Sequence, residues 1–520
     1  MEKVERFARN DNFMIVSGQG LGTDVKVTSS VVSFYNLLIK YTNDICLLSK
    51  IQMYSTVIES ICSLTEHYLR TMVNESRKDE DNRTIASMNV SFILDNVVPR
   101  VSSQLNHHFN RPIPELDTLR AKLRGEIDIS QPKRPLTNQE RIKIYYECLH
   151  TIQDIQSWAE GWFYYPHDRS HPPFKEIKRD NLALWFAWAF WHERLEIVQQ
   201  NRAWATEIEW MLTTAEDHFQ VKFPSGYNPV LRCIRLNFDP VQATHRPLAV
   251  YVAIYLATLV FNSLFLQWIW GLRYTDVDEQ HPVGYWSGHT TSPEVPLVFI
   301  HGVGVGLLGY VDFLHQLLTQ SGRRPVFLVE LPYVSMRLVD HVPSATETVK
   351  AIEGMLNRFG YTKAVFVSHS LGTGVASWVS RFAPHLIAGS VMVDPICFLL
   401  HYHHVAFNFI HRLPKVLIEY ILCYGVSREL YISHFISRHL QWFETIHFGD
   451  GLNDATVFLS ENDRIIGTHL VYNYLKEHGI DVHIMPSLEH AQFLFDAKWK
   501  ATILEHIDKT SRKADLKNKT

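Results

Sequence analysis

Short runs of β-branched and aromatic residues alternate with helical stretches from residue 293 onward. Such runs, separated by helices, are typical of a parallel sheet in which each strand is followed by a crossover helix. The six runs are residues 296–300, 325–329, 364–367, 390–393, 455–459 and 481–485. The pattern predicts an α/β domain over residues 285–506, with six parallel strands in a mostly parallel sheet.

The third run leads directly into the sequence Ser368-His369-Ser370-Leu371-Gly372, and a helical pattern follows. A serine on a sharp strand-to-helix turn needs small residues two positions before and after it, because the helix packs closely against the strand. Ser368 and Gly372 meet this need. A short motif of this kind also occurs by chance in serine turns. Its position after a strand and before a helix favours Ser370 as a nucleophile, beside the free amide groups of the helix start.

A glycine-rich turn, HGVGVG at residues 301–306, follows the first run about seventy residues before Ser370. Glycines after a strand let the chain curl so that a main-chain N–H points into a site, and the residue after the nucleophile supplies a second N–H. We therefore expect Val303 and Leu371 to donate to an oxyanion. The residues expected to support them are His301, Gly302, Gly304 and Gly372. The turn lacks the patterns of phosphate-binding loops.

The general base is expected on the loop after the last strand, where His490 lies in the sequence PSLEHAQF at residues 486–493. The acid that orients it is expected after the preceding strand, where Asp463 lies in SENDR at residues 460–464. The chain order Ser, Asp, His fits this arrangement. Asp394, at the end of the fourth run, is the second candidate for the acid. Its alternative interpretation is a turn or helix-capping residue.

Together, the motifs HG-x-G-x-G, S-H-S-L-G, S-E-N-D-R and L-E-H-A-Q-F resemble the α/β-hydrolase superfamily, over about 215 residues. The resemblance implies a serine esterase or lipase in which Ser370 attacks an acyl carbon and His490 shuttles the proton. It also implies that Asp463 holds the imidazole and that water releases the acyl group. The motif does not carry the aspartate nucleophile of the epoxide hydrolases and dehalogenases of this superfamily.

An insertion of about fifty residues, 396–447, lies where this superfamily places its lid. It is apolar and aromatic, which suits a lipid or other long acyl substrate and contact with a bilayer. Its histidines His401, His403 and His404 could suggest zinc. No acidic or thiolate partner stands nearby at ligand spacing, so we predict packed or solvated lid histidines and no metal.

Residues 248–272 form a stretch of 25 residues without a charged side chain. This length crosses a hydrocarbon core of about 30 Å at about 1.5 Å per helical residue. Trp268 and Trp270 at one end, with Arg246 and Arg273 outside the two ends, are typical of interfacial anchors. The sequence predicts a single transmembrane helix, and the alternative is a buried hairpin of core helices.

The charges that flank this stretch predict an orientation. Arg232, Arg235 and Arg246 precede it, whereas Arg273 is followed by acidic residues. By the positive-inside rule, the amino-terminal part is cytosolic and the hydrolase domain lies on the far side. The protein is expected to be a single-pass membrane protein, with the organelle left open.

The remaining regions carry no motif. Residues 1–127 and the aromatic-rich residues 136–245 are predicted to be mainly helical, and residues 507–520 to be a solvated polar tail. The charged amino terminus lacks the apolar segment of a secretory signal peptide. Nothing in these regions identifies a protein partner.

Composition narrows the classes of partner. The chain has 50 Lys and Arg against 54 Asp and Glu, so no nucleic-acid partner is expected. Its six cysteines lack a C-x-x-C pair, which favours reduced thiols. No cofactor is expected.

The sequence thus predicts a membrane-associated serine hydrolase that cleaves carboxylic esters, with lipid esters as the substrate class. Two alternatives stay open. One is a non-catalytic α/β-hydrolase-fold protein that binds a partner or acts as a scaffold. The other is a thioesterase or peptidase, because the acyl-transfer machinery is shared.

Overall fold

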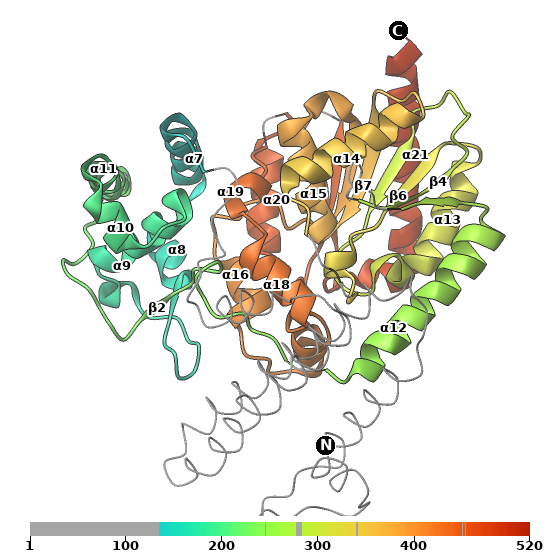
Figure 1. Cartoon of the computed structure of the whole chain (residues 1–520). Helices are drawn as coiled ribbons and strands as arrows, with labels where there is room; N and C mark the ends of the chain where they lie inside the picture. The colour runs from blue at the N-terminus through green and yellow to red at the C-terminus, as the bar shows by residue number, and fades with distance from the viewer. Residues whose placement is uncertain are drawn as a thin grey trace, which may run out of the picture. The chain divides into compact units, whose positions relative to one another are not determined.

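A computed structural model describes residues 135–244, 246–276, 283–337, 339, 342–449, 451–452 and 454–519. The helical region expected at residues 1–127 lies outside the described residues. Figure 1 shows the described elements from α7 to α21, which include a helical region, the apolar helix α12 and an α/β domain.

The sheet of the α/β domain has eight strands in the order β10-β9-β8-β7-β5-β6-β4-β3. Its strands are β3 (Arg273–Thr275), β4 (Tyr285–Gly288), β5 (Leu297–Ile300), β6 (Val326–Val329), β7 (Ala364–His369), β8 (Ile387–Val393), β9 (Ala455–Ser460) and β10 (Asp481–Met485). The six strands from β5 to β10 pair in parallel and correspond to the six predicted runs. The sequence did not reveal β3 and β4, which pair antiparallel at the β6 edge.

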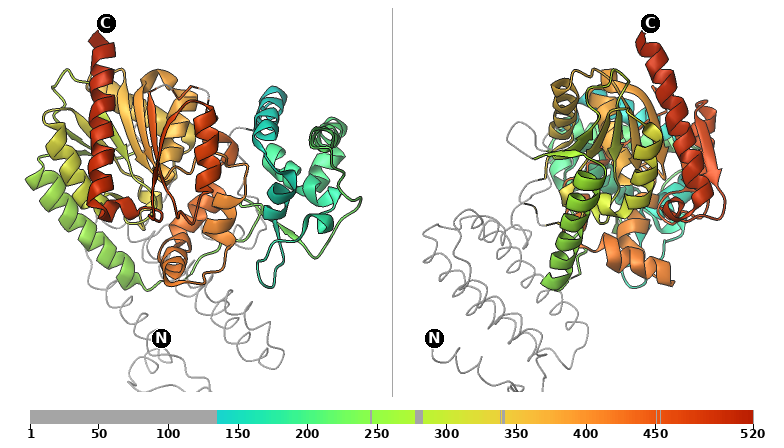
Figure 2. Two further views of the ribbon diagram at one scale, coloured as in Figure 1. Left: turned by 180° about the vertical axis from the view of Figure 1, so that it is seen from behind. Right: turned by 90° about the vertical axis from the view of Figure 1, so that its right-hand side faces the viewer.

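Side chains that alternate along the strands pack into two separate hydrophobic cores. Val298, Phe366 and Leu459 belong to the core that includes residues of α14, α15 and α20. Phe299 and Val367 belong to the core that includes residues of α13 and α21. The helices are α13 (Val311–Ser321), α14 (Ala345–Arg358), α15 (Leu371–Phe382), α20 (Thr468–Glu477) and α21 (Ala497–Lys519), with short turns η5 (Gly306–Tyr310), η6 (Pro332–Val334), η7 (Pro384–Leu386) and η10 (Gln492–Phe495). Both faces of the sheet are covered, as a parallel sheet requires, and Figure 2 shows α21 along one face.

The polar tail predicted from residue 507 is instead the second half of α21, which continues to Lys519. Ile507, Ser511 and Ala514 are buried on the inner side of this helix. Asp515 accepts from Arg324 at 2.7 Å. The prediction was wrong because the charged residues lie on the solvent side of an amphipathic helix, while a few small and apolar residues at helical spacing pack inward.

Residues 135–244 fold into short helices around an aromatic cluster. The elements are α7 (Asn138–Thr151), α8 (Ile155–Gly161), β1 (Phe163–Tyr164), η2 (Phe174–Glu176), α9 (Arg179–Phe186), η3 (Ala187–Trp191), α10 (Leu195–Gln200), α11 (Arg202–His218) and β2 (Arg232–Cys233). The indole N–H groups of Trp158 and Trp162 both donate to the carbonyl oxygen of His401, at 2.7 and 2.9 Å. This region therefore contacts the segment between β8 and β9.

That segment is the insertion predicted to be a lid, and it is helical. Its elements are α16 (His404–Ala406), η8 (Phe407–His411), α17 (Leu417–Leu422), η9 (Cys423–Ser427), α18 (Leu430–Arg438) and α19 (Trp442–Thr445). It follows β8 and precedes β9, so it emerges at the carboxyl edge of the sheet. Side chains at this edge are therefore within reach of the lid.

The apolar stretch forms α12 (Leu248–Phe261) and continues as the π-helix η4 (Asn262–Ile269). Within the described part of the chain, Val250–Ile269 is the one helix long and apolar enough to cross a membrane, by length and composition. Only 17% of it is buried. The alternative of a buried hairpin is therefore not what the structure contains.

Candidate active site

Ser370 lies on a sharp turn between β7, which ends at His369, and α15, which begins at Leu371. Its backbone has φ 52° and ψ −123°, a strained conformation for a residue with a side chain. Gly372 lies so close to β5 that a Cβ atom there would be 2.3 Å from the carbonyl oxygen of Ile300. The glycine is thus required for the helix to start at this turn.

The structure brings Ser370, His490 and Asp463 into one hydrogen-bonded row. Nε2 of His490 lies 2.9 Å from Oγ of Ser370, and its Nδ1 lies 2.6 Å from Oδ2 of Asp463. Each residue follows a different strand, so the three meet because parallel strands end at the same edge. These are the three residues that the sequence selected.

Asp463 is held by its own loop. Its Oδ1 accepts from the backbone N–H groups of Ile465 at 2.7 Å and Ile466 at 3.2 Å. Its other oxygen is left to face His490. The side chain is fully buried, so no water competes for that bond.

The charge state of His490 is set by opposing effects. Burial lowers the pKa of the imidazole, but the charge and hydrogen bond of Asp463, and then the charge of Asp394, raise it to about 9. The imidazolium is therefore the favoured form at neutral pH.

The predicted oxyanion donors flank the nucleophile. Leu371 is the first residue of α15 and follows Ser370 directly. Val303 belongs to the glycine-rich turn, where a Cβ atom on Gly302 would be 2.8 Å from Cβ of Ser370. Gly304 has a φ of 141°, which favours glycine. The turn and the helix start thus lie on either side of the serine.

His301 fixes the glycine-rich turn. Its Nδ1–H donates to the carbonyl oxygen of Gly302 at 2.7 Å, and its Nε2 accepts from the N–H of Leu331 at 3.0 Å. Burial lowers the pKa of His301 to about 4, so the ring is neutral and can accept. It acts as a link between the turn and the loop after β6.

Asp394, the second candidate for the acid, forms a different set of bonds. Its carboxylate accepts from the N–H of Ser460 at 2.8 Å, from the hydroxyl of Ser460 at 3.1 Å and from the N–H of Ala491 at 2.9 Å. Burial raises the pKa of Asp394 to about 6. The residue lies at the turn after β8 and joins two loops, as the alternative interpretation of a turn residue expects.

Sequence reasoning missed a link through Tyr310. Its oxygen accepts from the N–H of Gly302 at 2.9 Å and lies 2.6 Å from Nδ1 of His369. Burial holds the pKa of His369 well below its usual range, so this imidazole is neutral. Tyr310 therefore ties the glycine-rich turn to the residue before the nucleophile. It belongs to no motif, and no signal in the sequence marks it.

Two clusters among the described residues could bring three metal ligands within 4.8 Å of one another. One is Asp394, Asp463 and His490, which is the site itself. The other is Asp481, His483 and His506. The lid histidines belong to neither, and Nε2 of His401 lies 3.0 Å from Oγ1 of Thr151. The absence of a metal stays a prediction.

Comparison with protein-family models and with curated proteins finds no match. Similar solved structures include a carboxylesterase of Nitrososphaera gargenis, with 16% identity and a TM-score of 0.35, covering 46% of this chain and 99% of that chain. A membrane phospholipase A, described as a bacterial virulence factor, has 14% identity and a TM-score of 0.36 over 51% and 96% of the two chains. The naproxen esterase of Bacillus subtilis has 11% identity and a TM-score of 0.38 over 50% and 96%. Similarity at this level does not transfer an activity.

Proposed function

We propose that this chain, whose carboxy-terminal domain has the α/β-hydrolase fold, is a membrane-associated serine hydrolase of carboxylic esters. The strand order, with a serine on the turn after β7, is the basis of the fold assignment. The observation that carries the activity is the hydrogen-bonded row from Asp463 through His490 to Ser370. Nucleophile, base and orienting acid are the parts that acyl transfer needs.

The proposed reaction has two stages. Ser370 attacks the acyl carbon and passes its proton to Nε2 of His490, while the N–H groups of Val303 and Leu371 bind the oxyanion. The tetrahedral intermediate then breaks the ester bond, and His490 returns the proton to the leaving alcohol. Water, deprotonated by His490, attacks the acyl-enzyme and releases the acid and the free serine.

Exposed apolar surface on the lid and on α12 supports lipid esters as the substrate class. The lid carries exposed apolar side chains, including Leu417 and Ile421, and α12 carries more, including Leu256 and Val260. Long acyl chains are bound in apolar surroundings with few polar groups. Membrane association of the protein would bring it to such substrates.

A fluorophosphonate probe tests the proposal. We expect the full-length protein to be labelled and Ser370→Ala to lose all labelling. Ser368→Ala is the matched control, because Ser368 is an equally buried serine two residues away and belongs to no step of the reaction. Folded wild-type protein that resists the probe would favour the non-catalytic scaffold.

We expect kcat/KM to rise with pH through an apparent pKa near 9. His490 must be neutral to accept the serine proton, and a raised pKa keeps it protonated at neutral pH, so activity is lost as the pH falls below this value. Ester hydrolysis measured between about pH 6 and about pH 10 gives the profile. A midpoint near the ordinary histidine value of about 6.5 would contradict the influence of the two carboxylates.

A further inference from the structure

Two exposed apolar helices meet at one end of the hydrolase domain. We call their outer side chains the apolar face, represented by Leu256, Val260 and Trp268 of α12–η4 and by Leu417, Ile418 and Ile421 of α17. Trp268 is 79% exposed and Leu417 is 76% exposed. Exposed apolar surface of this extent marks an interaction site.

The chain that leads into α12 is hydrogen-bonded to the lid segment that follows α17. A guanidinium N–H of Arg246, before α12, donates to the carbonyl oxygen of Tyr424 in η9 at 2.6 Å, and the N–H of Thr244 donates to the carbonyl oxygen of Arg428 at 2.9 Å. In Figures 1 and 2, the amino-terminal end of α12 reaches the lid at the end of the domain opposite the carboxy terminus. The two segments that make up the apolar face therefore approach each other at the amino-terminal end of α12.

The inner side of α12 packs on the domain along its whole length. Tyr251, Thr258, Phe261 and Leu266 are buried at helical spacing. The hydroxyl of Tyr251 donates to Glu429 at the start of α18 at 2.8 Å. At the other end of the helix, Leu266 shares a core with residues of α13. Both ends of the helix are thus attached to the same folded domain.

This attachment conflicts with a helix that crosses a bilayer. A span of 20 residues covers about 30 Å, the thickness of the hydrocarbon core. If α12 crossed it, the flank of the domain against which it packs, with the carboxylate of Glu429, would lie inside the hydrocarbon. Burying that polar surface is costly. A helix with one buried stripe and one apolar outer side instead fits the plane of the membrane interface.

We infer that the apolar face is a monotopic binding surface for a lipid bilayer, to which α12 and α17 both contribute and which α12 does not cross. The inference makes the membrane association of the proposed function specific, because it names the surface that binds the bilayer. Its link to lipid substrates rests on the proposed function. It replaces the opposite-side topology expected from the flanking charges, because the chain before and after α12 then lies on one side.

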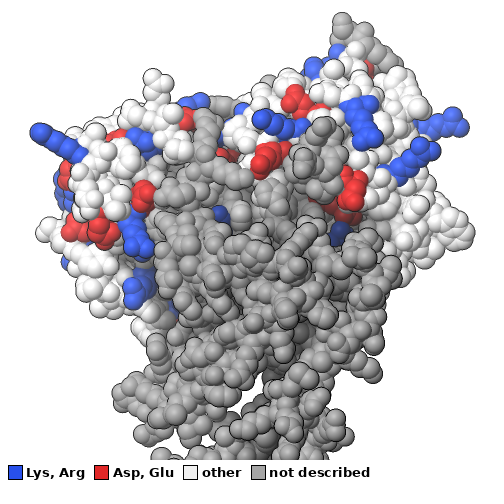
Figure 3. Space-filling model, in the orientation of Figure 1, with Lys and Arg blue, Asp and Glu red and all other residues white. Residues whose placement is uncertain are grey.

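The charges around the apolar face fit phospholipid headgroups. Val250–Ile269 holds no charged residue. Lys415 and Arg273, which are exposed, flank α17 and α12–η4 in the sequence, and long basic side chains at such positions can reach headgroups. In Figure 3, the described surface at the lower right, where α12 lies, carries neither basic nor acidic side chains. A lipid surface with anionic headgroups therefore fits better than an apolar protein partner without them.

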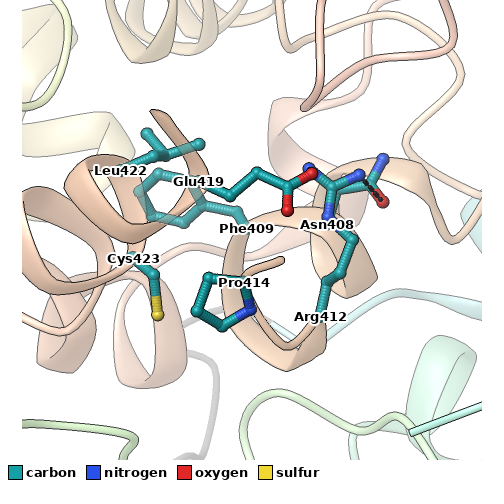
Figure 4. A pocket seen from close by; sticks show the side chains of 7 residues that line it. All are labelled: Asn408, Phe409, Arg412, Pro414, Glu419, Leu422 and Cys423. Carbon is teal, nitrogen blue, oxygen red and sulfur yellow. Dashed lines mark hydrogen bonds and ion pairs between the residues drawn. The ribbon is translucent and has the colours of Figure 1, made fainter. Parts of the chain in front are cut away.

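The one acidic residue of α17, Glu419, is turned inward. Its carboxylate accepts from the N–H of Lys415 at 2.7 Å and pairs with Arg464 at 3.0 Å and Arg412 at 3.5 Å. Figure 4 shows it beside Arg412 and Asn408 at one side of a pocket that Phe409, Leu422 and Cys423 line at the other. The outer side of α17 is thereby left free of acidic charge.

The inward ion pairs connect the lid with the site. Arg464, which follows Asp463, also donates to Glu489 at 3.1 Å, and Glu489 precedes His490. The helix that faces the membrane is thus tied to the loops of both the orienting acid and the base.

Vesicle flotation of the purified full-length protein tests the surface. With phosphatidylcholine vesicles that contain phosphatidylserine, we expect binding that falls at least about tenfold in Leu256→Asp/Val260→Asp and in Leu417→Asp/Ile421→Asp. Leu516→Asp is the matched control, because Leu516 is 68% exposed near the end of α21, far from the face. Circular dichroism checks folding. If either double variant bound the vesicles as strongly as the wild-type protein, the proposal that both helices contribute to the membrane-binding surface would be overturned.

Topology is tested separately in sealed membranes. Cysteines placed before and after α12, in Ala243→Cys and Asp276→Cys, should react alike with an impermeant thiol reagent, and the parent protein gives the background. Reaction at one position alone would show a span and overturn the inference. Ser370→Ala should bind vesicles like wild type, so a failed surface and a failed enzyme give different results.

Discussion

Replacing His490 with alanine is expected to lower kcat by a factor on the order of 10^5 while the protein stays folded. His490 is the group that hydrogen-bonds Oγ of Ser370, at 2.9 Å, and without it the serine has no acceptor for its proton. Nucleophile and base act as a unit, so losing one removes most of the benefit of the other. Hydrolysis of a soluble ester, with thermal unfolding as the folding control, measures both quantities.

Histidine controls make this result specific. His385 is exposed and pairs with Glu353 at 2.9 Å, so His385→Ala should keep wild-type activity. His369 is the informative second variant, because its ring centroid lies 5.4 Å from that of His490. Retention of activity within about tenfold in His490→Ala would contradict the assignment and make His369 the next base to test.

The parallel strands and the site residues could be predicted because they follow local rules. Strands buried on both faces are continuous apolar runs, and the loops after them carry the residues that meet at the carboxyl edge. The strands β3 and β4 escaped prediction because they lack such a run: Arg273 lies in β3, and Ser287 and Gly288 lie in β4. Their place is set by the pairing of β4 with β6 and of β3 with β4, which is a tertiary effect.

Other features depend on neighbours that a sequence does not reveal. In α12 nearly every residue is apolar, so no pattern separates the buried Phe261 from the exposed Val260. Only the packing against the lid and α13 distinguishes the two sides. The end of α21 was predicted wrongly for the opposite reason, since its buried residues are too few to outweigh its charged composition. These residues are Ile507, Thr510, Ser511 and Ala514.

The two carboxylates near His490 show most plainly where sequence reasoning stops. Asp394 and Asp463 follow neighbouring strands, β8 and β9, and either position could supply the acid. The structure separates them by their partners, because Asp463 bonds the imidazole and Asp394 bonds backbone and hydroxyl groups of the adjacent loops. Their roles should therefore differ in kind: Asp463 orients the base, whereas Asp394 positions the loop that carries it through the N–H of Ala491.

Asp463→Asn is accordingly expected to lower kcat by about 10^4, because an amide neither stabilises the imidazolium nor holds the required tautomer. Asp394→Asn should cost only about tenfold, since an amide oxygen can still accept the N–H of Ser460. The pH profile separates the two roles further. Losing the charge of Asp463 lowers the pKa of His490 more than losing that of Asp394, because Asp463 contributes the larger raising effect. A larger loss of kcat in Asp394→Asn than in Asp463→Asn would reverse the assignment and make Asp394 the orienting acid.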